Sequence, residues 1–280
     1  MSDTPADRKA LEALLALPDD AIDLAQAALL IARQEYPDLE VGRYLLRLDD
    51  MAAEIGARLR GGEGAMSRIA HLNRYLFDDL GFRGNAEEYD DPRNSFLNDV
   101  LDRRLGIPIS LSTVYMEVGR RLGFPIHGVS FPGHFLVRWL ERDRQDILLD
   151  PFHRGRIMSE DECRRRLDES LGGRIPFRTD LFGRARTRDI LERMLLNLKV
   201  LYEKEHDFHR ALRAQHSLLC LRPDEAALLR ERGLLHFRIA CFAEARADLE
   251  AYLERAPRAP DADTVRRQMP KLRSLSPVMN

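Results

Sequence analysis

Cysteine is scarce in this sequence. The 280 residues include three cysteines, and none of them precedes Cys163. An odd number of scattered thiols without C-x-x-C spacing argues against a disulfide framework and against a structural zinc site. We therefore expect Cys163, Cys220 and Cys241 to be buried or incidental thiols, and a nucleophilic cysteine in the first half of the chain is excluded.

The sequence also lacks long apolar runs and an excess of charge of either sign. Its 44 basic and 46 acidic side chains give a net charge of -2, which favours neither nucleic acid nor an anionic membrane as a partner. No window approaches the ~18 to 20 apolar residues of a membrane span, and the N-terminal residues do not resemble a signal peptide. We predict a cytoplasmic protein without nucleic-acid or membrane partners.

Helix-forming sequence dominates the first part of the chain. Apolar residues recur there at intervals of three and four, and glycine or proline separates the segments. Pro108 is expected to break the helical pattern, with a new helix beginning near Ser110. The helical segments that we predict are residues 21–36, 41–59, 65–80, 96–105 and about 110–122.

The pattern then changes from helical to alternating. Short apolar runs cover residues 126–131, 135–140 and 147–150. Such runs are typical of an antiparallel meander. A helix packed on this sheet predicts an α+β domain.

The C-terminal third repeats with a period of 34 residues. Phe208 corresponds to Phe242, and Leu201 to Leu235, at this spacing, and we expect the two phenylalanines to fill equivalent core layers. A small residue at the helix crossing and a proline after the second helix resemble the tetratricopeptide repeat. Because a solenoid needs about three units, we expect the helix at 188–200 or the first domain to cap the array. The remaining pairs are Ala211 with Ala245 and Pro223 with Pro257.

A histidine and a carboxylate stand in the alternating region. His134 lies in Phe-Pro-Gly-His-Phe at residues 131–135, and Asp150 follows sixteen residues later, before Pro151. The order of a helix, a strand with histidine and a strand ending in Asp-Pro resembles the transglutaminase-like superfamily. Residues 104–112 and 131–135 resemble its SirB-type branch, in which tetratricopeptide repeats follow the core. The resemblance implies that His134 is the base and Asp150 its orienting carboxylate.

The resemblance does not supply a nucleophile. The superfamily places a cysteine at a helix start, and Pro108 occupies the matching position here. Proline has neither a nucleophilic atom nor an N–H, so thiol-dependent acyl transfer is not expected. We expect His134 and Asp150 to share a hydrogen bond between adjacent strands, with Pro108 facing His134.

Two alternative arrangements would give this site a nucleophile or a metal ion. Ser110, near the helix N-terminus, could complete a Ser110-His134-Asp150 triad, although a capping role for its hydroxyl is simpler. A metal could be held by His134 and Asp150 with His127 or His153, but the two further histidines have no ligand spacing. We predict no metal and no cofactor.

A cluster of residues before a predicted helix is a further candidate for lining the same cleft. It could bind a ligand or simply form the turn and cap of that helix, and it consists of Tyr89, Asp90, Asp91, Arg93 and Asn94. The sequence thus predicts a transglutaminase-like domain with a helical N-terminal region at 1–184 and an all-α tetratricopeptide-repeat domain at 185–280. The predicted function is a catalytically degenerate scaffold or regulator that binds a protein or peptide; the alternative is a hydrolase or acyltransferase that uses Ser110.

Overall fold

The chain forms two compact units. The computed structural model describes residues 5–141, 145–172 and 174–275. One unit extends to Met194 and the other begins at Leu195, within one helix. The domain boundary between residues 184 and 185 stays a prediction. None of the helices in the described ranges is long and apolar enough to cross a membrane.

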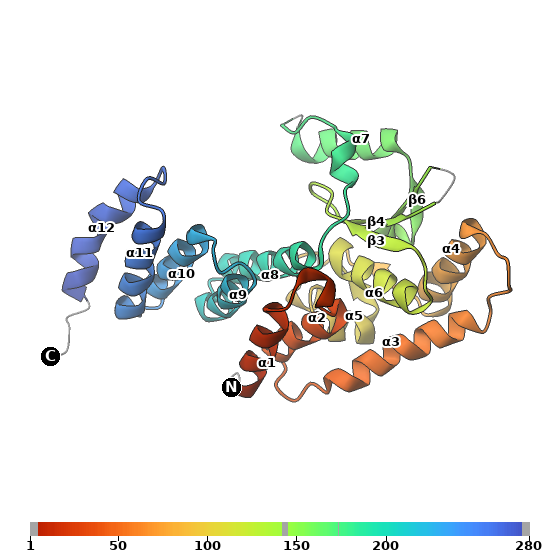
Figure 1. Cartoon of the computed structure of the whole chain (residues 1–280), viewed down its shortest axis with the longest axis horizontal. Coiled ribbons are helices and arrows are strands. Elements are labelled where there is room, and N and C mark those ends of the chain that lie inside the picture. Colours follow the sequence, from red (N-terminus) through yellow and green to blue (C-terminus); the bar gives the residue numbers. More distant parts are fainter. Residues whose placement is uncertain (1–4, 142–144, 173, 276–280) are drawn as a thin grey trace. The chain divides into compact units, whose positions relative to one another are not determined.

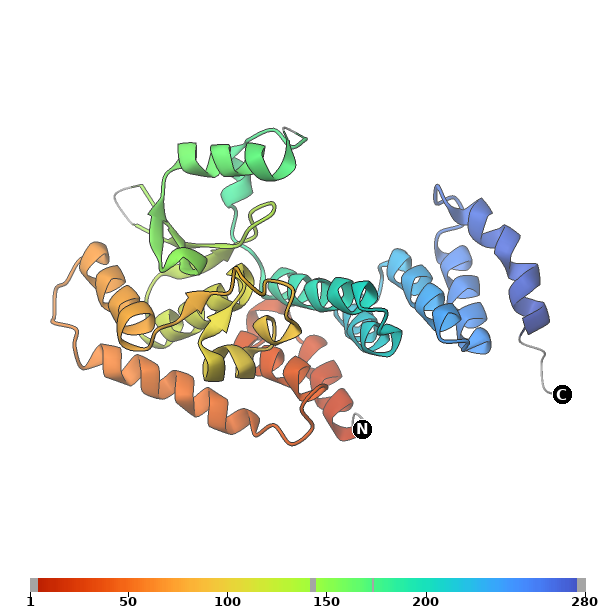
Figure 2. The same ribbon diagram turned by 180° about the vertical axis from the view of Figure 1, so that it is seen from behind.

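Helices make up most of the first unit up to residue 121 (Figure 1, Figure 2). Local capping starts some of them: the Asp23 carboxylate accepts the Gln26 N–H at 2.9 Å, immediately before α2. The segment predicted at 65–80 forms α4 and a π-helical turn, η2. The bounds are α1 Pro5–Leu15, η1 Asp19–Ala21, α2 Leu24–Arg33, α3 Val41–Gly56, α4 Ala65–Asn73, η2 Arg74–Asp79, η3 Pro92–Asn94, α5 Leu97–Arg103 and α6 Pro108–Arg121.

A four-stranded antiparallel sheet follows α6. The strands are β3 (Ile126–Val129), β4 (Leu136–Trp139), β5 (Ile147–Asp150) and β6 (Arg156–Met158), and they pair in chain order. The predicted three-strand meander is confirmed, and β6 extends it. A separate parallel pair joins β1 (Arg83–Gly84) to β2 (Leu105–Gly106).

Helix α6 is the centre of the first unit. Every residue from Pro108 to Gly119 is buried, because α6 packs against β3 and β4 as well as against α2, α3 and α5. Gly119 permits this close approach: a Cβ there would lie 2.1 Å from the Ile126 Cδ1 atom. A helix that is buried all round fixes the position of every side chain at its N-terminus.

The opposite face of the sheet is covered by α7 (Glu160–Leu171) and the turn η5 (Thr179–Phe182). In Figure 1 the sheet lies between α6 and α7. The apolar residues that α7 contributes to the core beneath it are Cys163 and Leu167. Helices on both faces of an antiparallel sheet confirm the α+β class that was predicted.

The second unit consists of helices alone. Gly233 allows α10 and α11 to approach closely, since a Cβ there would lie 2.9 Å from Leu249 Cγ. Ala211 and Ala245 are fully buried at equivalent positions, as the 34-residue period predicts. Phe208 and Phe242 are each the first residue of a helix and only half-buried, so the expectation that they fill core layers was wrong. Helix α8 (Thr187–Lys204) belongs to this unit from Leu195 onward, and the other helices are α9 Phe208–Leu221, α10 Ala226–Arg238, α11 Phe242–Arg255 and α12 Ala262–Leu275.

Candidate functional site

His134 lies in the turn that leads into β4. Gly133, with a φ of 71°, takes the left-handed conformation that this turn requires, and the His134 N–H donates to the Phe131 carbonyl at 3.0 Å. The turn aims the imidazole inward, where only 2% of the residue is exposed. Its Nε2 atom is 2.9 Å from Asp150 Oδ2. The predicted hydrogen bond between His134 and Asp150 is therefore confirmed, but His134 lies in the turn before β4 and not, as we had expected, on a strand.

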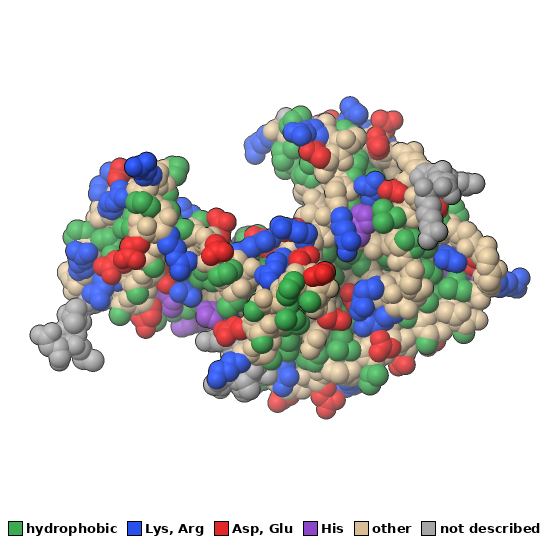
Figure 3. Space-filling view, in the orientation of Figure 1, with side chains coloured by type: hydrophobic (Ala, Val, Ile, Leu, Met, Phe, Trp, Pro, Cys, Tyr) green, Lys and Arg blue, Asp and Glu red, His purple; other side chains and the backbone are tan. Residues whose placement is uncertain are grey.

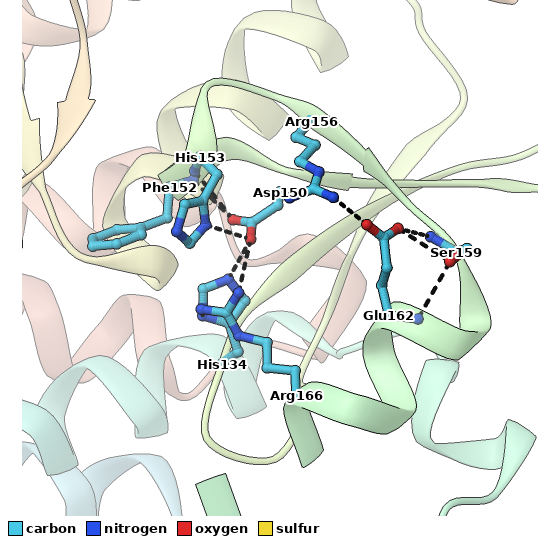
Figure 4. Close-up of polar contacts among 8 residues, drawn as sticks. All are labelled: His134, Asp150, Phe152, His153, Arg156, Ser159, Glu162 and Arg166. Carbon is cyan, nitrogen blue, oxygen red and sulfur yellow. Dashed lines mark hydrogen bonds and ion pairs between the residues drawn. The ribbon is translucent and has the colours of Figure 1, made fainter. Parts of the chain in front are cut away.

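Asp150 ends β5 and is fully buried. Its Oδ1 atom accepts the backbone N–H groups of Phe152 and His153 at 3.1 and 3.4 Å, which caps the turn η4 (Pro151–His153). Its Oδ2 atom accepts both from His134 and from the His153 Nδ1 atom, at 2.8 Å (Figure 4). Burial favours the neutral acid, but the hydrogen bonds from the two histidines prevail and hold the pKa of Asp150 well below its ordinary value.

The second nitrogen of His134 is occupied by Arg166. A capping box starts α7: Ser159 Oγ accepts the Glu162 N–H at 3.2 Å, and the Glu162 carboxylate accepts the Ser159 N–H at 2.9 Å. Arg166 lies one turn beyond Glu162, and its Nη2 atom is 3.2 Å from His134 Nδ1 (Figure 4).

This contact decides the protonation of His134. A guanidinium can only donate, so Nδ1 must accept and Nε2 carries the proton that it donates to Asp150. Burial and the positive charge of Arg166 lower the pKa of His134, although Asp150 opposes them. Both ring nitrogens are thus used within the site, and no hydroxyl or thiol in the described ranges hydrogen-bonds to them.

The residues at the start of α6 do not offer a nucleophile. Helix α6 begins at Pro108, two residues earlier than we predicted, because proline is well suited to a first helical turn. The Ser110 hydroxyl is fully buried, accepts the Ile107 N–H at 3.1 Å and lies 2.6 Å from the Asn94 carbonyl. Ser110 is therefore not the N-cap that we predicted: Ile107 is the cap residue, and the hydroxyl of Ser110, the third helical residue, accepts its N–H. The placement of Pro108 facing His134 stays a prediction.

The residues predicted to line a cleft fall in two places. Asp91 and Arg93 line a shallow cavity of about 440 Å³ formed by residues 86–91 and Arg93. Asp91 also caps η3 and pairs with Arg93 and Arg103. Asn94 is fully buried beneath this loop and donates to the Glu88 carbonyl at 2.6 Å. Neither His134 nor Asp150 lines this cavity, so their shared role in binding stays a prediction.

Aromatic packing links that loop to His134. The Phe152 ring lies edge-to-face with both His134 and Tyr89, at centroid distances of 6.1 and 6.2 Å. Gly84 leaves room for it, since a Cβ there would lie 2.6 Å from the Phe152 ring. Tyr89, which is 47% exposed, therefore reaches the same side of the unit as His134.

The two further histidines behave differently from one another. His153 joins the site through Asp150, which corrects our expectation that it lacks ligand spacing; His134, Asp150 and His153 offer ligand atoms within 4.8 Å of one another. His127 lies on β3 and lines a separate cavity of about 860 Å³. The Arg166 guanidinium, 3.5 Å from Asp150 Oδ2, opposes a divalent cation at the cluster by like charge.

The cysteines do not supply a thiol to this site. Cys163 is fully buried in the apolar cluster beneath α7, with its side chain among Val129, Phe131 and Leu136. Burial raises the pKa of its thiol to about 11, which is the opposite of nucleophile activation. Cys220 and Cys241 are half-buried and form no disulfide.

Two arginines of the site were not predicted from the sequence. Arg166 is one of three consecutive arginines in α7, and only its position beside the apolar stripe of Cys163 and Leu167 distinguishes it. Arg193 lies in α8, where its Nη1 atom donates to the Phe131 carbonyl at 3.0 Å. Charged side chains of both signs are interspersed on the face in Figure 3, so charge density alone would not have located either residue.

Comparison with known proteins places the chain in a family. Residues 42–196 match the model of the transglutaminase-like superfamily, and residues 198–270 match a tetratricopeptide-repeat model. A UPF0162 protein of Xylella fastidiosa is 42% identical over 260 residues, covering 90% of this chain and 91% of that protein. A UPF0162 protein of Vibrio cholerae is 29% identical over 250 residues, covering 89% and 92%.

A eukaryotic protein shows the same similarity over part of its length. Human F-box only protein 21 is 30% identical over 266 residues, which cover 84% of this chain and 41% of that protein. No solved structure matches the chain. These matches confirm the predicted resemblance to the SirB-type branch: the chain belongs to the UPF0162 family, in which a transglutaminase-like domain precedes tetratricopeptide repeats.

Proposed function

We propose that this protein is a catalytically degenerate transglutaminase-like protein that binds a protein or peptide partner in the cytoplasm. The surface around His134 and the tetratricopeptide helices would both take part. One observation carries the proposal. The His134 nitrogen that would take a nucleophile's proton, Nδ1, already accepts a hydrogen bond from Arg166.

This arrangement is unfavourable for general-base catalysis. A base must be within hydrogen-bond reach of the proton that it removes, and the Arg166 guanidinium is in that place. Protonation of His134 would also put a cation against Arg166. The hydrolase alternative with Ser110 has less support, because the Ser110 hydroxyl is directed to the Asn94 carbonyl and is fully buried.

The second unit supports the binding role with an apolar cavity. This cavity, of about 440 Å³, lies between α10, α11 and α12. Leu234 and Phe237 on α10 line it and remain 42% and 38% exposed. Exposed apolar side chains in a groove are typical of a protein-interaction surface.

Chemical labelling tests the loss of catalysis. The full-length protein is treated with a fluorophosphonate for serine and iodoacetamide for cysteine, and the modified residues are mapped by mass spectrometry. We expect no adduct at Ser110. We also expect the wild type and Ser110→Ala to hydrolyse ester and amide substrates at the same rate. Hydrolysis that disappears in both Ser110→Ala and His134→Gln would overturn the proposal.

Peptide selection tests the binding role. A random peptide library is selected on the full-length protein, and the peptides obtained are measured against variants by fluorescence anisotropy. Leu234→Gln with Phe237→Gln removes the apolar lining of the second unit, whereas Leu275→Gln removes a similarly exposed leucine that does not line the cavity. A scaffold role would be contradicted if no peptide were selected, or if substitutions on the surfaces of the two units left the binding of every selected peptide unchanged.

A further inference from the structure

Arg193 is a half-buried cation without a carboxylate partner in the described part of the chain. Its Nη1 atom donates to Ser130 Oγ at 3.1 Å and to the Phe131 carbonyl at 3.0 Å. The guanidinium carbon lies 5.7 Å from the centre of the Phe135 ring. Because both hydrogen-bond acceptors are neutral, the charge of Arg193 is not compensated, and burial lowers its pKa.

A second guanidinium is attached to the same turn. Arg166 bonds to His134 Nδ1, and Arg193 bonds to the Phe131 carbonyl three residues earlier. The nearest carboxylate to Arg166 is Asp150 at 3.5 Å, which already accepts from two imidazoles and two backbone N–H groups. Asp150 is thus shared by several donors, whereas Arg193 has neutral acceptors and leaves its positive charge uncompensated.

Tyr89 completes the accessible edge of this site. Its ring packs on Phe152, which packs on His134. Burial raises the pKa of Tyr89, and the positive charges of Arg193 and Arg166 oppose that rise, so both guanidinium groups lie within electrostatic range of its hydroxyl. Asp90 is also in range of Tyr89. An anion is therefore favoured on the side of Tyr89 that faces the arginines.

We propose that Tyr89, Arg166 and Arg193 bind the carboxylate of an aspartate or glutamate side chain in a peptide ligand. The proposal rests on the binding function above and names the ligand class of the His134 site. Guanidinium groups match the planar geometry of a carboxylate, and a phenol can donate to it. The half-buried Phe152 ring provides apolar contact for the flanking peptide.

The excess charge favours a carboxylate over a phosphate. One uncompensated positive charge neutralises a monoanion, whereas a phosphate carries nearly two negative charges near neutral pH. Asp150 and Asp90 would repel the second charge. A carboxylate is thus the anion that this set of side chains compensates.

Two model compounds test the inference on the full-length protein. N-acetyl-glutamate methylamide and its glutamine analogue are titrated while the arginine Nε–Hε signals are followed by NMR. We expect saturable shifts of Arg193 and Arg166 with the glutamate compound and none with the glutamine compound. Inorganic phosphate should bind no more tightly than the glutamate compound.

Matched variants locate the binding. Arg193→Gln should weaken binding of the glutamate compound about tenfold or more, because a charge-assisted hydrogen bond is lost. Arg193→Lys keeps the charge without the planar fork and should lose part of the affinity. Arg184→Gln removes an exposed arginine from elsewhere in the unit and should bind as the wild type does. Unchanged backbone NMR spectra verify that each variant is folded.

Different experimental results would contradict the carboxylate site and the proposed binding function. Equal shifts with the glutamine compound, wild-type affinity in Arg193→Gln, or tighter binding of phosphate would overturn the carboxylate site. Selected peptides that bind the His134 surface without an acidic residue would also overturn it, while leaving the binding function intact. If no selected peptide bound either unit, the binding function itself would be contradicted.

Discussion

The two halves of the site differ in what their polar groups do. On the sheet side, Asp150 receives hydrogen bonds from His134 and His153, and Arg166 covers the remaining imidazole nitrogen. On the helix side, Pro108 starts α6, and the Ser110 hydroxyl bonds to backbone groups. An enzyme with a nucleophilic side chain needs that side chain within hydrogen-bond reach of the base, so that the base can take its proton. Here each half satisfies its hydrogen bonds internally.

The proposed loss of catalysis rests on this difference. The histidine and its carboxylate keep the geometry of a base and its orienting group, with an Nε2 to Oδ2 distance of 2.9 Å. The Arg166 guanidinium on α7 donates to the other imidazole nitrogen, which therefore acts as a hydrogen-bond acceptor. The following predictions test whether the two halves are independent, from the largest expected effect to the smallest.

Asp150→Ala should have the largest effect. It removes the acceptor of two imidazoles and two N–H groups at a fully buried position, leaving Arg166 without its carboxylate. We expect the free energy of unfolding to fall by about 3 to 5 kcal/mol, measured by denaturant unfolding. Asp150→Asn keeps the shape and an acceptor oxygen, so its loss should be smaller. A loss below 1 kcal/mol in Asp150→Ala would mean that the sheet-side network is not structural.

Ser110→Ala tests the helix side. The Asn94 carbonyl and the Ile107 N–H lose their partner at a fully buried position, so we expect a loss of about 1 to 3 kcal/mol. Ser112→Ala is the matched control, because the Ser112 hydroxyl is equally buried and has no hydrogen-bond partner in the described ranges. It should leave stability unchanged or raise it. Equal losses in the two variants would remove the structural role assigned to Ser110.

The sequence predicted these two halves unequally. The spacing from His134 to Asp150, with alternating apolar runs, was sufficient to predict the hydrogen bond between them, because the meander is local in sequence. Arg166 was not predictable in the same way. Three successive arginines in α7 differ only in the direction they face, and that direction depends on how Cys163 and Leu167 pack beneath the sheet.

His153 illustrates a second limit of prediction. We expected no ligand spacing for this residue, three positions after Asp150, but the capped turn η4 folds it back onto the carboxylate. An aspartate followed by proline at a strand end favours such a turn, so this signal was present in the sequence. Asn94 shows the converse. Its sequence context was equally compatible with an exposed residue of a cleft, but in the structure Asn94 is buried and supports a loop through its hydrogen bond to the Glu88 carbonyl.

Gly84→Ala tests the packing that joins the loop to the site. The new methyl group would lie 2.6 Å from the Phe152 ring, which must move away from its contacts with Tyr89 and His134. Because a side-chain ring can yield, we expect a loss of about 1 kcal/mol, at the lower end for overpacking. Gly42→Ala in α3 meets no atom within 4 Å and should be neutral or stabilising. Unshifted Phe152 ring signals in NMR spectra of Gly84→Ala would contradict the contact.

The smallest effect concerns the proton on His134. Burial and Arg166 lower its pKa in the folded protein, whereas an unfolded histidine titrates near its ordinary value of about 6.5. Between these two values the unfolded state binds more protons, so stability falls as the pH drops from about 6.5 through the folded pKa. Arg166→Gln removes the guanidinium charge that contributes to this lowering.

The folded pKa of His134 should therefore rise in Arg166→Gln, and this histidine's share of the acid-induced loss of stability should shrink. Side-chain NMR titration measures the pKa, and the same spectra report whether Nε2 carries the proton, as Arg166 requires in the wild type. Arg165→Gln removes the same charge from the adjacent, exposed residue and should leave the titration unchanged. An Nδ1-protonated ring in the wild type would show that Arg166 does not cover the base, and the sheet-side half would then be free to act on a substrate.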